Sequence, residues 1–299
     1  MNIVQTNQSK PDWLRIKPKF DNDFSKIKTA LRKRGLVSVC EEANCPNMAE
    51  CWHNEGTATF MVLGDTCTRG CKFCAIKTNA KGQEVDIFEP IKLADAIAEM
   101  ELDYAVITSV DRDDLLDGGA EHFAKCIREI KKRTPNTMVE VLIGDFQGKQ
   151  EDIQKIIDAK PDVIAHNIET IERLQKKVRD LRANYKQSLS VLEYVKKQNK
   201  DIFTKSSVMV GVGEEKEEVI QAMKDLRGVG CDVFTLGQYL KPKNKVLEVK
   251  EWVSPEKFEE YKQIGEEIGF LYVASGPFVR SSYKAGELFM KNLIGKSGA

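Results

Sequence analysis

The chain has 299 residues, of which 41% are hydrophobic and 31% charged, and its 46 Lys and Arg balance its 46 Asp and Glu. This zero net charge disfavours a duplex-binding protein and a polybasic membrane binder, because both need a positive surplus. The sequence has no apolar stretch near the ~18 residues of a membrane span and no signal-peptide core at its N-terminus, so we expect a soluble cytoplasmic protein without nucleic-acid or membrane partners.

Three cysteines stand in the first part of the chain, in the pattern Cys40-x4-Cys45-x5-Cys51. In a reducing compartment, cysteines grouped this closely are more often metal ligands than disulfide partners. This segment therefore predicts metal or redox chemistry.

From about residue 59, short apolar runs alternate with amphipathic segments, which is typical of βα units around a parallel sheet. Six runs rich in Val, Ile, Phe or Thr predict strands, and a seventh at 271–274 is weaker. The six are Thr59–Leu63, Ala105–Ser109, Met138–Ile143, Asp162–Ala165, Ser206–Val210 and Asp232–Leu236. Between them, residues such as Phe123, Cys126, Ile127 and Ile130 share one helical face, which predicts helices packed on the sheet. About 240 residues of this kind fit an open doubly wound sheet or a complete or partial TIM-type barrel.

The loop after the first predicted strand carries a second cysteine triplet, Cys67-x3-Cys71-x2-Cys74. No Gly-x-Gly-x-x-Gly fingerprint follows this strand, which disfavours a dinucleotide-binding sheet. In a barrel the loops after the strands form the active-site face. The position of the motif therefore predicts a catalytic site.

Two later segments carry weaker signals. The Lys176–Lys186 stretch predicts a solvated helix face. Near the C-terminus, Ser254 is a predicted N-cap and Pro255 a first-turn residue, and an apolar stripe follows. We expect this last helix to lie outside the six-unit core.

The number and type of the ligands favour iron-sulfur clusters over zinc. Structural zinc takes four N or S ligands, commonly as two close pairs, whereas each group here offers three thiolates. A cubane with three cysteine-held irons leaves the fourth iron open to an exogenous ligand, which implies chemistry at the cluster. One zinc site with four thiolates from both triplets remains an alternative, although it leaves two thiolates unexplained.

The remaining cysteines and the histidines give little functional signal. Cys126 and Cys231 are predicted core residues, because free cysteine behaves as a small hydrophobe. His53 and His122 are assigned no role. His166 ends the fourth predicted strand, where a pocket role and a structural role both remain open.

The residues from Cys67 to Cys74, with Phe73 before the last cysteine, resemble the cluster motif of the radical S-adenosylmethionine superfamily. The Cys40–Cys51 segment resembles the auxiliary-cluster segment of lipoyl synthases, and Arg280-Ser281-Ser282-Tyr283 resembles their C-terminal signature. The resemblance extends from residue 11 to about 286. The segment from Ser207 to Glu214 resembles the superfamily's Gly-x-Ile-x-Gly-x-x-Glu segment, but it departs from it at the first position, where this chain has Ser207 in place of glycine.

The resemblance implies both a fold and a function. The expected fold class is α/β: a partial (βα)6 TIM-type barrel at 59–240, an N-terminal segment at 1–58 that carries the auxiliary cluster, and a C-terminal extension at 241–299 that caps it. The implied activity is that of a sulfurtransferase of lipoate biosynthesis, which inserts two sulfur atoms at C6 and C8 of a protein-bound octanoyl chain. Two molecules of S-adenosylmethionine are cleaved to 5'-deoxyadenosine and methionine per lipoyl group, and the auxiliary [4Fe-4S] cluster donates the sulfur.

The resemblance also implies roles for single residues. The radical-generating [4Fe-4S] cluster is expected on Cys67, Cys71 and Cys74, and Arg280 is expected to orient or displace a serine ligand of the other cluster. That auxiliary cluster is expected on Cys40, Cys45, Cys51 and Ser282. Contacts to S-adenosylmethionine are expected at Phe73, Thr108, Asn167, Glu169, Gly211, Glu214 and Gln238.

The implied partners are octanoylated lipoyl carrier domains, namely the E2 subunits of 2-oxoacid dehydrogenases and the H protein of glycine cleavage. A flavodoxin or ferredoxin reductant and an iron-sulfur carrier for cluster repair complete the set. Three alternatives remain. Another radical enzyme with an auxiliary cluster should not need Arg280–Tyr283, an electron carrier would not cleave S-adenosylmethionine, and a zinc-stabilised nucleic-acid module should be basic.

Overall fold

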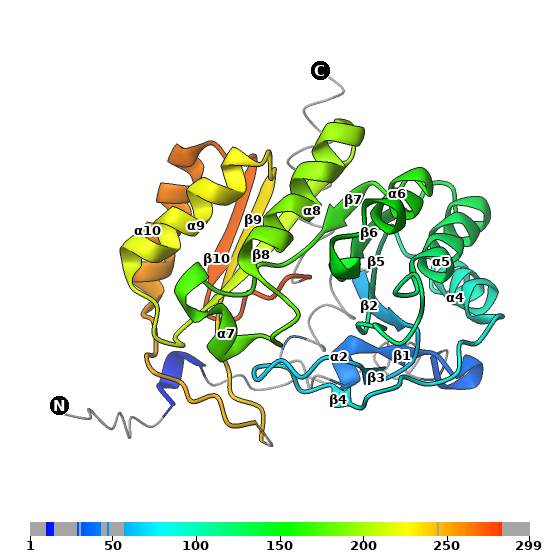
Figure 1. Cartoon of the computed structure of the whole chain (residues 1–299), viewed down its shortest axis with the longest axis horizontal. Helices are drawn as coiled ribbons and strands as arrows, with labels where there is room; N and C mark the ends of the chain where they lie inside the picture. The colour runs from blue at the N-terminus through cyan, green and yellow to red at the C-terminus, as the bar shows by residue number, and fades with distance from the viewer. Residues whose placement is uncertain are drawn as a thin grey trace.

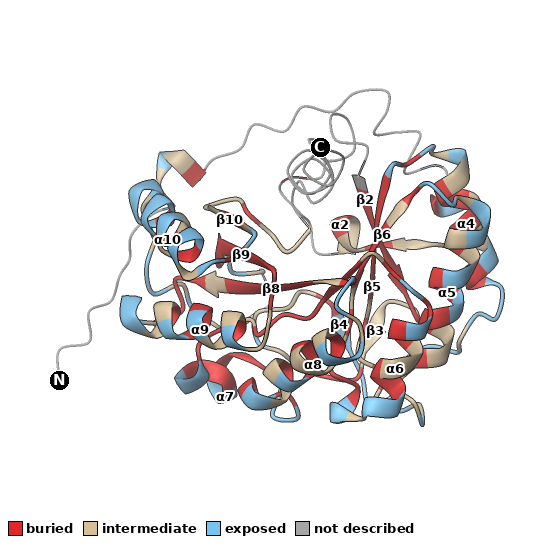
Figure 2. Ribbon diagram, turned by 90° about the horizontal axis from the view of Figure 1, so that it is seen from above, coloured by how far each residue is buried: buried red, intermediate tan, exposed pale blue. Residues whose placement is uncertain are grey.

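The structure is a computed structural model, and it describes residues 10–14, 29, 31–42, 47, 57–243 and 245–282. Within them, an eight-stranded sheet in the order β1-β2-β5-β6-β7-β8-β9-β10 curves into an open barrel with helices on its outer side (Figure 1, Figure 2). Neighbouring strands are parallel except β1, which runs antiparallel to β2. Since β1 and β10 form the two edges, the barrel is not closed. The predicted partial TIM-type barrel is confirmed.

All six predicted strands are present, with ends shifted by a few residues. They are β2 (Thr57–Val62), β5 (Tyr104–Ser109), β6 (Met138–Leu142), β7 (Val163–Ala165), β8 (Phe203–Val210) and β9 (Val233–Gln238). The weak seventh run is a full strand, β10 (Tyr272–Gly276), which pairs with β9 along its whole length. Its sequence signal is weak because an edge strand leaves several of its residues partly exposed. Three two-residue strands, β1 (Val37–Ser38), β3 (Thr66–Cys67) and β4 (Lys77–Thr78), complete the set of the described residues.

The helices on the outer side are amphipathic. They are α4 (Glu89–Glu99), α5 (Ala120–Arg133), α6 (Gln150–Asp158), α7 (Gln175–Val178), α8 (Tyr185–Gln198), α9 (Lys216–Gly228) and α10 (Pro255–Ile268). Short helices are η1 (Asp12–Leu14), α2 (Val39–Glu42), η2 (Phe146–Gly148) and η3 (Glu172–Leu174). The predicted apolar face of α5 is completely buried. No helix in the described ranges is both long and apolar enough to cross a membrane.

Helix α10 belongs to the barrel wall. Ser254 caps it as predicted, accepting a hydrogen bond from the Lys257 N–H. Phe258 and Tyr261 are buried in the same apolar cluster as Leu236 of β9, and the helix packs against β10 and α9. The expectation that this helix lies outside the six-unit core is wrong, because α10 follows β9, the sixth predicted strand, and packs on the barrel wall against β10 and α9. The division into segments at 58 and 240 stays a prediction.

The inside of the barrel contains a buried polar network near the start of the strands. Lys205 of β8 donates to both carboxylate oxygens of Glu140 on β6, at 2.8 and 2.9 Å, and the Tyr104 hydroxyl donates to the same carboxylate at 2.7 Å. All three side chains are buried. A buried charge is tolerated only when it is paired and hydrogen-bonded, and here both conditions hold.

Candidate functional site

The Cys67–Cys74 loop leaves β2 at the carboxyl end of the parallel strands. Leu63 and Gly64 turn the chain away from the strand with φ of 68° and 86°, a left-handed conformation that favours glycine at the second position. Cys67 lies in β3, and all three cysteines of the loop are partly exposed. The motif therefore occupies the active-site face, as its position in the sequence predicts.

Backbone N–H groups point at two of the three sulfur atoms. The Arg69 N–H donates to Cys67 Sγ at 3.4 Å, and the Asp180 N–H donates to Cys71 Sγ at 3.3 Å. Burial and the nearby Asp111 carboxylate raise the pKa of Cys67 to about 11, and burial raises the pKa of Cys71 to about 12. Bound cationic iron deprotonates such thiols. The N–H donors then stabilise the sulfur charge, so the donor set fits an iron-sulfur cluster.

A single zinc ion requires its ligand atoms to lie close together. A tetrahedral zinc ion with bonds of about 2.3 Å holds its sulfur ligands about 3.8 Å apart. Among the described residues, the one group of three ligand atoms within 4.8 Å of one another is made by Glu89, His122 and Cys126. The three loop sulfurs do not form such a group, so the described structure does not show them gathered for one zinc ion.

Arg69 fixes the loop to the barrel from inside the motif. Its guanidinium, 3% exposed, forms hydrogen bonds of 2.7 to 2.8 Å with the carboxylates of Asp113 and Asp145. Burial opposes ionisation of Asp145, but the guanidinium overrides burial and lowers its pKa to about 2. For Asp111, burial prevails over the attraction of Arg69 and raises the pKa to about 6. No pattern in the sequence predicts the pairing of Arg69 with these carboxylates.

A second segment, Val178–Arg182, clasps the loop from its outer side, and we call it the clasp. Its Asp180 carboxylate accepts the Gly70 N–H at 2.7 Å, and its Val178 carbonyl accepts the Lys72 N–H at 2.9 Å. Arg182 donates to the carbonyl of Thr68 at 2.6 Å. With the Asp180 N–H on Cys71, four bonds join the clasp to the residues around the second cysteine.

The clasp contradicts the prediction of a solvated helix face at Lys176–Lys186. Helix α7 ends at Val178 and α8 begins at Tyr185, so the residues between them form a turn rather than a helix. From its sequence, a turn rich in Arg and Asp cannot be distinguished from an ordinary solvent-exposed segment. Its partners are mostly backbone atoms more than 100 positions away, which no local pattern reveals.

His166 has a structural role, which decides between the two alternatives left open by the sequence. Its Nδ1 donates to the carbonyl of Ile143 at 2.9 Å, and its Nε2 lies 3.0 Å from the hydroxyl of Ser188. Arg179 of the clasp donates to the same hydroxyl at 2.8 Å. Burial lowers the pKa of His166 to about 4, so the ring is neutral near pH 7. The histidine thus supports the clasp.

Some of the residues predicted to contact S-adenosylmethionine face the barrel interior. Asn167 donates to Glu169 Oε1 at 3.2 Å, while its own Oδ1 is buried without a hydrogen-bond partner in the described structure. The hydroxyl of Thr235, on β9, is also buried without a hydrogen-bond partner among the described residues. Thr108 donates to the carbonyl of Leu142 at 3.1 Å, and Phe73 packs on the apolar cluster of β8 and β9. Orphaned buried polar atoms of this kind fit a polar ligand.

The other predicted contacts, Gly211, Glu214 and Gln238, gather where β8 and β9 end. Gly211 has φ of 96°, and a Cβ there would lie 2.2 Å from the Gln238 amide nitrogen. Gln238 donates to the Glu251 carbonyl at 3.0 Å and accepts the Val253 N–H at 2.9 Å. Glu214 accepts the N–H groups of residues 211 and 212. These side chains therefore hold the backbone around them, and their contact with S-adenosylmethionine stays a prediction.

The predicted auxiliary site is described in part. Cys40 is buried on α2, which packs against β1 and β2, and its N–H donates to Ser38 Oγ at 3.1 Å. Cys45 and Cys51 lie outside the described residues. Asn47, which stands between them in sequence, is buried and donates to the Phe278 carbonyl at 2.7 Å.

The C-terminal turn that contains the predicted serine ligand lies against the end of β9. A Cβ at Gly237 would lie 2.0 Å from the Val279 carbonyl oxygen, so this close approach requires glycine. Arg280 donates to the same carbonyl at 2.6 Å, and Ser281 and Ser282 follow in a half-exposed turn. The structure thus joins Asn47 to the turn that leads to Ser282.

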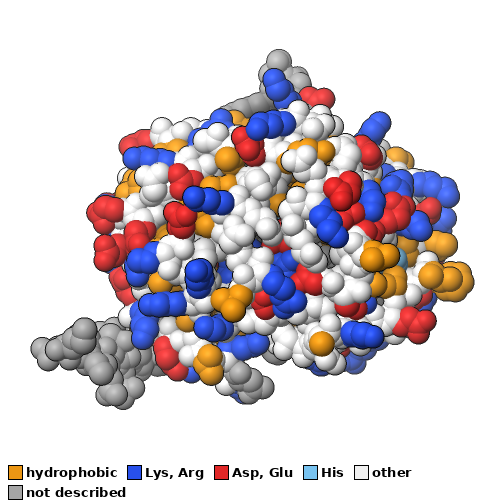
Figure 3. All heavy atoms as spheres, viewed as in Figure 1, with side chains coloured by type: hydrophobic (Ala, Val, Ile, Leu, Met, Phe, Trp, Pro, Cys, Tyr) orange, Lys and Arg blue, Asp and Glu red, His pale blue; other side chains and the backbone are white. Residues whose placement is uncertain are grey.

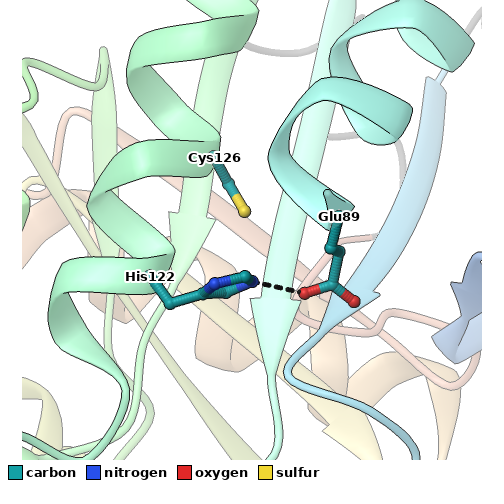
Figure 4. A group of neighbouring side chains, drawn as sticks. All are labelled: Glu89, His122 and Cys126. Atoms are coloured by element: carbon teal, nitrogen blue, oxygen red, sulfur yellow. Dashed lines mark hydrogen bonds and ion pairs between the residues drawn. The ribbon is translucent and has the colours of Figure 1, made fainter. Parts of the chain in front are cut away.

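Glu89, His122 and Cys126 form a second group of chemically capable side chains, between α4 and α5 on the outside of the barrel (Figure 4). His122 Nε2 donates to Glu89 Oε2 at 2.7 Å, and the same oxygen accepts the Leu63 N–H at 2.9 Å. Cys126 is completely buried. The Glu89 carboxylate thus accepts from both His122 and the backbone of Leu63, so it anchors the residue at which the cysteine loop begins. The predicted core position of Cys126 is confirmed.

Comparison with known proteins shows close relatives along almost the whole chain. A lipoyl synthase of Halobacterium salinarum is 57% identical over 298 residues, covering 98% of this chain and 95% of the relative. A lipoyl synthase of Myxococcus xanthus is 53% identical over 285 residues, covering 95% of each. A relative from Plasmodium knowlesi, named as an apicoplast lipoyl synthase, is 55% identical and covers 96% of this chain and 65% of its own length.

A family model and solved structures agree with these relatives. The family model of the radical SAM superfamily matches residues 61–226. Methylornithine synthase has a similar structure, with a TM-score of 0.58 and 13% identity over 85% of this chain and 75% of the other. The hydrogenase maturase of Carboxydothermus hydrogenoformans gives a TM-score of 0.57 and 15% identity over 92% and 78%. At such low identity these two structures support the fold alone.

Proposed function

Because the chain belongs to the lipoyl synthase family of the radical SAM superfamily, we propose that its two cysteine triplets divide the work of forming a lipoyl group. The enzyme is a sulfurtransferase that inserts two sulfur atoms into a protein-bound octanoyl chain, and its cofactors are two [4Fe-4S] clusters and S-adenosylmethionine. In this proposal Cys67, Cys71 and Cys74 hold the cluster that cleaves S-adenosylmethionine. The other triplet holds the sulfur donor.

When bound, the first cluster and S-adenosylmethionine supply a 5'-deoxyadenosyl radical, which can remove hydrogen from carbons that no general base deprotonates. The chain's part is positioning. Arg69 and the clasp hold the loop rigid, and the N–H groups of residues 69 and 180 stabilise charge on the ligand sulfurs. Asn167 and Glu169 are the side chains that we propose to receive polar groups of S-adenosylmethionine, because the Asn167 Oδ1 is buried and unsatisfied by described residues.

The donor cluster is proposed on Cys40, Cys45, Cys51 and Ser282. The observation that supports this assignment is the hydrogen bond from Asn47, which stands between Cys45 and Cys51 in sequence, to the Phe278 carbonyl in the turn before the serine. A serine oxygen is a harder ligand than thiolate and fits iron sulfide less well. The proposed serine corner is therefore the weak point at which the donor can be dismantled, with Arg280 oriented beside it by the Val279 carbonyl.

The substrate is an octanoylated lipoyl domain. We further propose the E2 subunits of 2-oxoacid dehydrogenases and the glycine cleavage H protein as its carriers, a flavodoxin or ferredoxin as reductant, and an iron-sulfur carrier for repair of the consumed cluster. The cytoplasmic location stays a prediction.

An anaerobic single-turnover reaction tests the assignment. The reconstituted chain is mixed with dithionite, S-adenosylmethionine and an octanoylated lipoyl domain, and the products are identified by mass spectrometry. We expect a domain with one added sulfur to form first and the lipoyl domain second, since two hydrogen abstractions require two separate cleavages. Ser282→Cys should slow sulfur insertion while preserving 5'-deoxyadenosine, with Ser281→Ala as the control. An unchanged rate of insertion in Ser282→Cys would contradict the serine assignment.

A further inference from the structure

The clasp brings the cysteine loop close to the outer surface of the enzyme. The Asp180 N–H donates to Cys71 Sγ, while the next residue, Leu181, is 81% exposed. Gly70 and Lys72, on the loop itself, are exposed as well. Cys71 is itself partly exposed, so this proposed cluster ligand lies near the surface. Electron tunnelling slows steeply with distance, so this surface is a short route for an electron to the cluster.

The same surface is basic. Within residues 172–186, five basic side chains and one carboxylate, Glu172, are exposed. One of the five, Arg173, is paired with Glu218 of α9 at 2.6 Å, so the other four carry the basic character of this surface. Asp180 is half-buried and paired with Arg182 at 2.8 Å. Figure 3 shows Lys and Arg side chains gathered over α7. We define the α7 patch as this surface with the loop lysine, namely Lys72, Lys176, Lys177, Leu181, Arg182 and Lys186.

The α7 patch and the proposed sulfur-donor site lie on different sides of the sheet. Helix α7 packs outside the curved sheet, and α2, which carries Cys40, lies at the open side of the barrel (Figure 2). The octanoyl chain must reach the proposed sulfur-donor cluster, so we expect its carrier domain to bind at the open side of the barrel. A partner on the outer side needs only to pass an electron.

We propose that the α7 patch is the docking surface of an acidic one-electron carrier protein that reduces the cluster on Cys67, Cys71 and Cys74. The inference rests on the proposed function, because it requires that cluster. Complementary charge steers the two proteins together, and the exposed Leu181 provides an apolar centre for the contact. In each encounter a reduced carrier loses one electron and the oxidised cluster gains it, so no further reactant is needed.

The test compares two reductants on the holoenzyme. An acidic flavodoxin, kept reduced by its own reductase, and dithionite are each used to drive formation of 5'-deoxyadenosine in wild type and in Lys176→Glu/Lys177→Glu. We expect the flavodoxin-driven rate at low flavodoxin concentration to fall about tenfold or more in the variant and the dithionite-driven rate to stay within about twofold. The flavodoxin-driven rate of wild type should also fall with added salt.

A matched control is Lys125→Glu, an exposed lysine on α5 at the far side of the molecule from α7 (Figure 1), which should respond like wild type. Binding provides a readout independent of turnover: zero-length carbodiimide cross-links between flavodoxin and the holoenzyme should map to Lys176 or Lys177. Cross-links confined to other surfaces, or an equal loss with both reductants, would overturn the docking proposal. A wild type inactive with dithionite would contradict the proposed function itself.

Discussion

Single buried side chains hold the cysteine loop in place. Arg69 reaches two carboxylates with its planar guanidinium, and its side chain is almost completely buried. A lysine in the same place would keep the charge but lose the two-pronged geometry. The sequence places Arg69 between two cluster cysteines, yet the identity of its partners depends on how β5 and β6 lie beside β2.

Arg69→Met should destabilise the fold by about 3–5 kcal/mol, because it leaves the buried Asp145 carboxylate without its partner. Arg69→Lys should lose less of the free energy of unfolding, since the positive charge beside Asp145 remains. Urea unfolding of both variants gives the free energies, and iron analysis gives the cluster content. If Arg69→Met unfolds within 1 kcal/mol of wild type, the ion pair does not carry the stability assigned to it.

His166 should make the stability depend on pH. Its folded pKa is about 4, below the ordinary 6.5, so the unfolded chain binds a proton more readily and stability falls as pH drops through 6.5. Between pH 7.5 and 5.5 we expect wild type to lose about 1 kcal/mol more than His166→Gln, which cannot titrate. Urea unfolding at both pH values measures the difference. Equal losses in the two proteins would show that His166 is not buried in the neutral form.

Among the helices, strands and loops, the sequence predicts those that follow from a local pattern and misses contacts between residues far apart in sequence. The six strands and the buried face of α5 follow from apolar runs and helical spacing, and the cysteine spacing predicts the cluster loop. The clasp is missed because its contacts are backbone hydrogen bonds to residues far away in sequence. Strand β10 is underrated because it has one neighbouring strand and a partly exposed surface.

The clasp should determine how firmly the loop holds its cluster. Asp180→Ala removes the acceptor of the Gly70 N–H, and a lost hydrogen bond to a charged group costs about 1.5–3 kcal/mol. Asp180→Asn keeps an acceptor oxygen and serves as the matched control. After desalting, we expect the alanine variant to retain less iron than the asparagine variant at unchanged secondary structure. Equal iron contents would mean that the clasp is not needed to hold the cluster.

The contact between the N-terminal segment and the C-terminal turn should matter for sulfur insertion more than for radical formation. Asn47→Asp is similar in size but lacks the N–H group that donates to the Phe278 carbonyl. We expect the ratio of lipoyl product to 5'-deoxyadenosine to fall in this variant, measured by mass spectrometry in one reaction. A parallel fall of both products would indicate general damage to the fold and would contradict a specific role.

At the scale of the whole molecule, the chain combines an open barrel with two cysteine triplets, which we propose serve different steps. The barrel places the first triplet at the carboxyl ends of its strands, and the two edges β1 and β10 leave a side open beside α2. The sequence predicts both triplets and the barrel. It does not predict from physics alone that residues 231 positions apart, Asn47 and Phe278, are joined, because that contact depends on how the whole sheet curves.

The most direct test of this division of work compares two matched triple variants, Cys67, Cys71 and Cys74 to Ala in one and Cys40, Cys45 and Cys51 to Ala in the other. Both 5'-deoxyadenosine and the lipoyl product are measured with dithionite under anaerobic conditions, together with iron, which should be about 8 per chain in wild type and about 4 in each variant. We expect the first variant to form neither product and the second to form 5'-deoxyadenosine without inserting sulfur. Cleavage of S-adenosylmethionine by the first variant, or sulfur insertion by the second, would contradict this division of work.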